Sequence, residues 1–116
     1  YLVKLGDLKA HLKAAIDGEH FEQTKMYPEF ARTAEKEGFP EISKIFWEIA
    51  KAEIAHEMRY KKLLKRIENG DMFKESKSVK WKCRNCGYVY EGKEPPKECP
   101  ACKHGKAYFE RLAENY

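Results

Sequence analysis

The stretch Glu53-Ile54-Ala55-His56 sets a carboxylate and an imidazole three residues apart in a segment rich in helix-forming residues. In an α-helix, side chains at positions i and i+3 project from the same face. That face also carries an apolar stripe on both sides of the pair: Ile42, Ile45 or Phe46, Ile49, Tyr60, Leu63 and Ile67. Because an ionised carboxylate is costly to bury without compensation, the stripe requires a positive charge beside Glu53.

A second pair of acids repeats this spacing upstream. Glu19 and Glu22 interrupt an apolar stripe made of Leu8, Leu12, Ala15, Met26 and Phe30. The basic residues of both segments lie largely off the stripes, so a metal ion is the better source of the missing charge. The pattern matches the di-metal carboxylate bundle, which uses a Glu from each of two helices and Glu-x-x-His from each of the other two. The alternative is that these acids only edge the stripe and face solvent.

Two helices are predicted to carry the stripes. The first spans residues 8–37 with Asp7 as its N-cap, and the second spans about residues 41–69. Gly38 is a helix-stop signal, and the short connection after it implies an antiparallel hairpin. Pro28 lies inside the first helix, where it should kink the helix or free one carbonyl.

The predicted ligand set favours iron or manganese, since calcium takes all-oxygen ligation and structural zinc prefers thiolates. Two helices offer three carboxylates and one imidazole, which is half of a closed four-helix site. We therefore expect another chain or an absent N-terminal half to complete the bundle, and the missing initiator Met hints at a fragment. A homodimer would double the ligand set.

Two Cys-x-x-Cys pairs form the stronger motif. Cys83 and Cys86 are separated from Cys99 and Cys102 by 12 residues. In a reducing compartment this pattern is typical of a four-thiolate tetrahedral metal site and not of two disulfides. The spacing leaves structural zinc and redox iron open, and the residues around the pairs favour iron.

Composition divides the chain into three parts: a helical hairpin at 1–70, a polar linker at 71–80 and a small metal-held domain with short strands at 81–116. The 116 residues carry 23 basic and 19 acidic side chains, interspersed along the helices, so we expect no nucleic-acid partner. No apolar run exceeds three residues, which excludes a typical membrane helix, and the start has no signal-peptide pattern. We expect a cytoplasmic protein.

These motifs, in this order, resemble the second half of a rubrerythrin: Gly18-Glu19-His20-Phe21-Glu22, Met26-Tyr27-Pro28, Glu53-Ile54-Ala55-His56, Cys83-x-x-Cys86-Gly87-Tyr88 and Cys99-Pro100-x-Cys102. The resemblance implies an all-α, ferritin-like four-helix bundle with a non-haem di-iron centre, to which this chain supplies one hairpin. It also implies a C-terminal rubredoxin-like domain with an Fe(Cys)4 centre. The implied activity is NAD(P)H-linked reduction of hydrogen peroxide to water, with electrons from a partner redox protein, in a homo-oligomer.

The resemblance also implies roles for individual residues. Glu19 and Glu22 would be iron ligands, Glu53 would bridge the irons, and His56 would be a terminal ligand. Tyr27 would lie near the irons, although it could equally be a plain core aromatic.

One departure from the family pattern concerns the residue after the last cysteine. Rubredoxins usually place Gly there, where this chain has Lys103. We expect Gly105 to take over the turn.

Two other functions remain open at this stage. One is a non-catalytic zinc-ribbon adaptor whose hairpin binds a partner helix, although adaptor faces seldom bury three acids. The other is iron oxidation and storage, for which the cysteine module has no obvious use.

Overall fold

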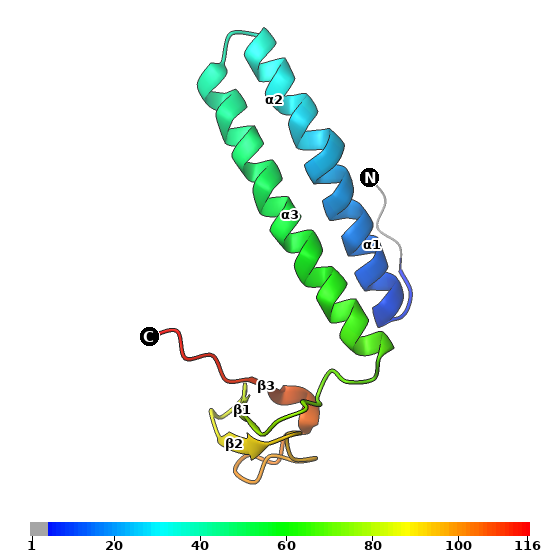
Figure 1. Ribbon diagram of the computed structural model, residues 1–116, viewed down its shortest axis with the longest axis vertical. Helices are drawn as coiled ribbons and strands as arrows, with labels where there is room; N and C mark the ends of the chain where they lie inside the picture. The colour runs from blue at the N-terminus through cyan, green and yellow to red at the C-terminus, as the bar shows by residue number, and fades with distance from the viewer. Residues whose placement is uncertain (1–4) are drawn as a thin grey trace. The chain divides into compact units, whose positions relative to one another are not determined.

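The computed structural model describes residues 5–116, and the first part of the chain is helical (Figure 1). It consists of α1 Leu8–Phe21, a π-helical segment η1 Glu22–Met26, α2 Tyr27–Lys36 and α3 Pro40–Glu68. Residues 1–4, where we predicted the start of the hairpin domain without a signal peptide, lie outside the described residues. Within the described part of the chain, no helix is long and apolar enough to cross a membrane.

The helices form the predicted antiparallel hairpin. Asp7 caps α1, because its side chain accepts a hydrogen bond from the amide of Ala10 at 2.8 Å. Gly38 ends the first helical arm with φ 88°, a left-handed conformation that residues with a Cβ avoid. The chain then enters α3 at Pro40, whose fixed φ suits the first turn of a helix.

The first arm differs from the single kinked helix that the sequence predicts. A π-helical turn precedes the proline: the amide of Tyr27 bonds the carbonyl of Glu22, five residues back. Pro28 has no N–H to donate to a carbonyl four residues earlier, and the wider turn absorbs this defect. The hydroxyl of Thr24 donates to the carbonyl of His20 at 2.5 Å, and the helix then continues as α2.

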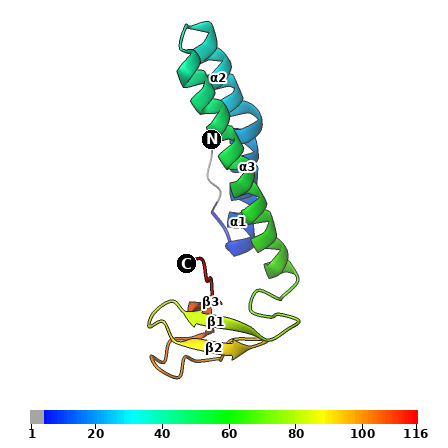
Figure 2. The same cartoon turned by 60° about the vertical axis from the view of Figure 1, so that its left-hand side comes forward.

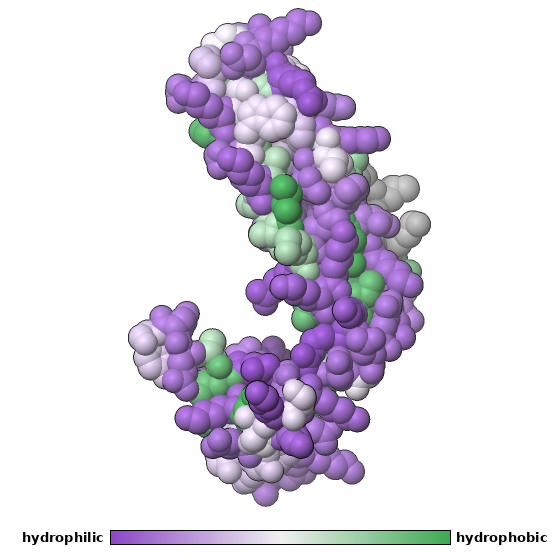
Figure 3. Space-filling model, viewed as in Figure 1, coloured by the Kyte–Doolittle hydropathy of each residue, from purple (hydrophilic) through white to green (hydrophobic). Residues whose placement is uncertain are grey.

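Small side chains fill much of the contact between the two arms of the hairpin. The buried residues there include Gly18, Ala31, Ala34, Ser43 and Ala50. Several large apolar side chains remain exposed, among them Phe30, Ile42 and Ile45 at 45%, 45% and 58%. Figure 3 shows hydrophobic side chains in patches along the helical unit. As predicted, a two-helix hairpin leaves part of its apolar surface against water.

The second unit contains a small antiparallel sheet, which Figure 2 shows with its connecting loops. Its elements are β1 Val79–Cys83, β2 Val89–Gly92, the 3-10 helix η2 Lys106–Tyr108 and β3 Phe109–Arg111. The strand order is β2-β1-β3, with Trp81 opposite Tyr90 on one side and Arg111 on the other. Its buried core consists of Trp81, Cys83, Cys99 and Phe109. This core is too small to hold a fold without a staple such as a metal.

The boundary between the two units lies after Gly70. Residues 71–80, which we predicted to be a linker, group with the second unit, and β1 begins inside them. The amide of Glu75 donates to the carbonyl of Lys93 at 2.9 Å, and its carboxylate lies 2.8 Å from Arg111. Polar composition did not reveal these tertiary contacts.

The turn after the second cysteine pair differs from our expectation. Gly105 does not take it over, since its φ is −73°, whereas Lys103 itself adopts φ 66°. The amide of Lys103 donates to the carbonyl of Cys99 at 3.0 Å, which closes the loop around the cysteines. The left-handed position therefore lies directly after Cys102, although a lysine occupies it.

Replacing Lys103 with Gly is expected to stabilise the second unit by about 1 kcal/mol, because a left-handed φ costs a side chain with a Cβ about 1–2 kcal/mol and glycine's extra chain entropy returns part of it. The ion pair lost with Glu98 is exposed, at 3.8 Å, and contributes little. The temperature at which the metal–thiolate absorption disappears measures the gain. Lys106→Gly is the control, and an equal gain there would contradict this origin.

Candidate metal centres

Three predicted ligands converge between α1 and α3. Glu19 comes from α1, and Glu53 and His56 come from adjacent turns of α3. One ligand atom from each lies within 4.8 Å of the others. Nδ1 of His56 lies 2.7 Å from Oε2 of Glu53 and 3.6 Å from Oε2 of Glu19. This arrangement gathers two carboxylates and an imidazole at one point of the hairpin.

The electrostatics of this cluster indicate a missing cation. Desolvation, a hydrogen bond with Glu53 and the charges of Glu53 and Glu22 together raise the pKa of Glu19 to about 7, against the lowering effect of His56. Oε2 of Glu19 is buried without a hydrogen-bond partner. Without a cation this carboxyl therefore holds its proton up to about neutral pH, and metal binding would displace the proton. The donor set fits a di-iron centre, of which these residues would hold one side.

Two further predicted site residues lie outside this cluster. Glu22 opens η1 and is half-buried, close enough for its charge to raise the pKa of Glu19. Tyr27 packs in an aromatic group instead, with its ring 6.0 Å from that of Phe30 and 6.1 Å from that of Phe46. These contacts are those of a core aromatic between α2 and α3.

A second polar group on the hairpin was missed at the level of sequence. Glu57 is buried, at 5% exposure, and Lys61, Gln23 and His20 surround its carboxylate. Hydrogen bonds from Lys61 and then Gln23 lower its pKa to about 2, against desolvation. The available signal was the spacing of four residues from Glu53, which also returns to the same side of a helix.

The four cysteines lie together as predicted. Sγ of Cys83 is 3.7 Å from Sγ of Cys102, Sγ of Cys86 is 3.7 Å from Sγ of Cys99, and all four fall within 4.8 Å of one another. A tetrahedral site with metal–sulfur bonds of about 2.3 Å has sulfur–sulfur edges of about 3.8 Å. The quartet therefore fits a single tetrahedral metal and the Fe(Cys)4 centre.

The surroundings of the thiols shift the pKa values of Cys86 and Cys102 in opposite directions. The backbone amide of His104 donates to Cys102 and, with side-chain bonds from Asn85 and His104, lowers the pKa of Cys102 to about 5. The amide of Tyr88 acts in the same direction on Cys86, but desolvation and the neighbouring thiols raise the pKa of Cys86 to about 12. Four thiolates cannot coexist here without a cation, which is the role of the metal.

Comparison with known families assigns both parts of the chain. Residues 3–64 match the sequence model of the family described as Rubrerythrin. Residues 81–110 match the model described as Rubrerythrin, rubredoxin-like domain. The two matches fall on the helical unit and on the unit that contains the cysteines.

Individual relatives give the same result. The chain is 54% identical over 114 residues to a putative rubrerythrin of Methanocaldococcus jannaschii, covering 98% of this chain and 56% of that protein. It is 50% identical over 112 residues to a rubrerythrin of Porphyromonas gingivalis, covering 97% and 56%. The chain thus spans little more than half the length of these relatives.

Solved structures of nigerythrin are similar in fold. The fully reduced, all-ferrous state superposes with a TM-score of 0.53 at 28% identity, covering 94% of this chain and 51% of that one. The partially reduced state gives a TM-score of 0.54 at 27% identity, covering 96% and 52%.

Proposed function

Since this chain belongs to the rubrerythrin family, we propose that it is part of a non-haem di-iron peroxidase that reduces hydrogen peroxide to water in oxidative-stress defence. The observation that carries the proposal is the presence, in one chain, of the Glu19–Glu53–His56 cluster and the four-cysteine site. The cluster provides hard oxygen and nitrogen ligands, and the cysteines provide a one-electron centre.

Glu19, Glu53 and His56 would bind one side of the iron pair, with Glu22 as a further ligand from η1. Glu53 is buried, and its contact with His56 orients the imidazole toward Glu19. Carboxylates suit this task because they can bridge two ions or bind one. Tyr27, whose ring lies 6.1 Å from that of Phe46, would be the tyrosine near the irons.

Reduction of one peroxide consumes two electrons and two protons, breaks the O–O bond and leaves two waters. When bound, the iron pair supplies the two electrons together, and the cysteine-held iron passes single electrons onward. Glu19, whose pKa lies near 7 without a cation, would lose its proton when it binds iron, so both protons of the reaction would come from other groups or from water. The electrons would come from NAD(P)H through a partner redox protein, in the cytoplasm.

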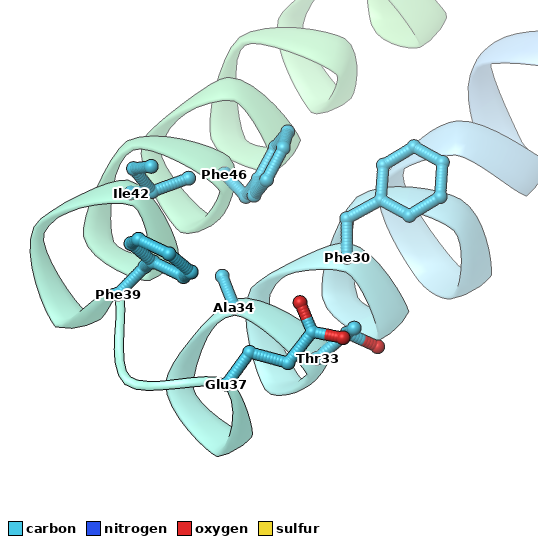
Figure 4. Close-up of a pocket in the computed structure, with 7 residues that line it drawn as sticks. All are labelled: Phe30, Thr33, Ala34, Glu37, Phe39, Ile42 and Phe46. Carbon is cyan, nitrogen blue, oxygen red and sulfur yellow. The ribbon is translucent and has the colours of Figure 1, made fainter.

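The bundle needs a complementary half, from an N-terminal hairpin or a second chain in a homo-oligomer. Figure 4 shows Phe39, Ile42 and Phe46 on one arm and Phe30 on the other, near the tip of the hairpin. These side chains line an apolar pocket of about 400 Å³. His56, with 56% of its side chain exposed, lines a groove of about 580 Å³ along α3. Two further helices would fill the apolar pocket near the tip with their own apolar side chains. The same helices would bring the remaining iron ligands to the groove beside His56.

A single-turnover experiment tests the function. The anaerobically purified protein is reduced, one equivalent of peroxide is added, and the return of the Fe(Cys)4 absorption is followed by stopped-flow. We expect two electrons to leave the protein per peroxide, and rapidly only when Glu53 is present. Equal and slow reoxidation of wild type and Glu53→Ala would refute the peroxidase.

The other candidate functions give different results in the same samples. A zinc-ribbon adaptor would be colourless in every oxidation state. An iron-storage protein would accumulate ferric mineral on repeated additions of ferrous iron and oxygen, whereas the peroxidase should not.

A further inference from the structure

Glu57 connects α3 to both parts of the helical arm that carries the carboxylate ligands. Its Oε2 accepts a hydrogen bond from Nε2 of Gln23 at 2.9 Å, across the hairpin. Nδ1 of His20 lies 3.2 and 3.3 Å from its two oxygens. Lys61, on the same helix as Glu57, lies at 2.7 Å. The carboxylate thus has two partners across the hairpin and one within its own helix.

The positions of these partners follow the predicted ligands by one residue. His20 comes directly after Glu19, Gln23 directly after Glu22, and Glu57 directly after His56. One residue along an α-helix turns a side chain by about 100°. The polar group is therefore a second connection between the same helical turns, made by hydrogen bonds and independent of any metal.

The arm needs such a connection because its backbone is irregular there. Gln23 belongs to η1, where the π-helical turn widens the helix. A π-helical turn interrupts the regular α-helical hydrogen bonding, so the stability of this segment depends more on tertiary contacts. Thr24 supports η1 from within the arm, through its bond to the carbonyl of His20, whereas the bonds of His20 and Gln23 to Glu57 connect this part of the arm to α3.

We propose that Glu57 is a positioning residue: through His20 and Gln23 it holds the segment carrying Glu19 and Glu22 in register with Glu53 and His56 before any metal binds. That these four residues bind a metal rests on the proposed function. Residues that hydrogen-bond to a metal ligand orient that ligand, and their loss typically weakens metal affinity by about 10–100-fold. Glu57 does not contact the ligands Glu19 and Glu22 themselves in this proposal; it fixes the backbone from which they project.

Three variants separate this role from general stabilisation. Glu57→Leu removes the acceptor but keeps a side chain of similar size in the buried site. Glu57→Gln keeps one acceptor oxygen for Gln23 and should restore most of the effect. Lys61→Met is the matched control, because it removes the neighbouring charge and keeps the apolar stem while leaving both bonds across the hairpin in place.

The first measurement is amide hydrogen exchange in the full chain, with zinc in the cysteine site and no metal in the hairpin. In Glu57→Leu we expect exchange of the η1 amides, residues 22–26, to accelerate about tenfold, as for loss of a hydrogen bond to a charged group. Lys61→Met should stay within about twofold of wild type. Unchanged exchange of η1 in Glu57→Leu would overturn the proposal.

The second measurement is the affinity of the hairpin for Co²⁺, read from its visible absorption in the same zinc-loaded protein. We expect about tenfold weaker binding in Glu57→Leu, recovery in Glu57→Gln and little change in Lys61→Met. If Co²⁺ affinity instead followed the thermal stability of all three variants, Glu57 would be merely structural and the proposal would be wrong. If wild type bound no Co²⁺ in the hairpin while η1 still loosened in Glu57→Leu, the metal assignment would fail and the positioning of the segment would stand.

Discussion

Replacing Glu53 with Ala is expected to abolish metal binding in the hairpin while leaving the Fe(Cys)4 absorption intact. Glu53 is 9% exposed and contacts His56 at 2.7 Å, so its loss removes one ligand and the contact that orients another. The same residue shares a hydrogen bond with Glu19. Iron per chain, measured on anaerobically purified protein, should fall to the single ion held by the cysteines.

Glu48→Ala is the matched control for this variant. Glu48 lies on the same helix, but its side chain is 68% exposed and pairs only with Lys51 among the contacts of the described chain. Its removal should leave the iron content unchanged. If the Glu53 variant also retained the iron content of wild type, the hairpin would not be an iron site.

Replacing Cys83 with Ser is expected to have the opposite effect, removing the visible absorption and unfolding the second unit while the hairpin stays helical. Cys83 is fully buried at the end of β1 and its thiol is one of four in the quartet. Metal binding contributes on the order of 10 kcal/mol to the folding of small metal-held modules. The core of Trp81, Cys83, Cys99 and Phe109 cannot replace that contribution.

Absorption spectra and circular dichroism together measure this result. Ala101→Ser is the control, because it introduces the same hydroxyl into the second cysteine loop at an exposed position that holds no metal. The colour and the melting of the second unit should survive in that variant. A Cys83 variant that kept the colour and the melting transition would show that the four cysteines do not stabilise the second unit.

Much of this architecture can be predicted from local sequence, because it depends on backbone preferences and on the spacing of nearby residues. Gly38 and Pro40 define the hairpin turn through their backbone preferences, and the structure places both as expected. The Cys-x-x-Cys spacing leads to a tetrahedral cluster, since two residues between cysteines let both thiols reach one ion. Glu53 and His56 meet because three residues nearly complete a helical turn.

Other features could not be predicted from the sequence, because the same local sequence is compatible with several backbone conformations. Pro28 predicts a defect in the first helix but does not say whether it becomes a kink or the π-helical turn of η1. Lys103 takes a left-handed φ against its own preference, because the loop around Cys99 requires it. The segment at 71–80 reads as a linker until Glu75 meets Arg111 from the end of the chain.

The amino-acid sequence therefore determines which residues repeat along each helix and where the chain turns, since these follow from backbone geometry. It does not determine how far each helix rotates about its own axis when the two arms pack. That rotation, set by close contact at small residues such as Ala31 and Ala50, turns Glu57 inward beside Glu53. Adjacent residues on a helix differ by about 100°, so only tertiary packing decides which of them is buried and needs a partner.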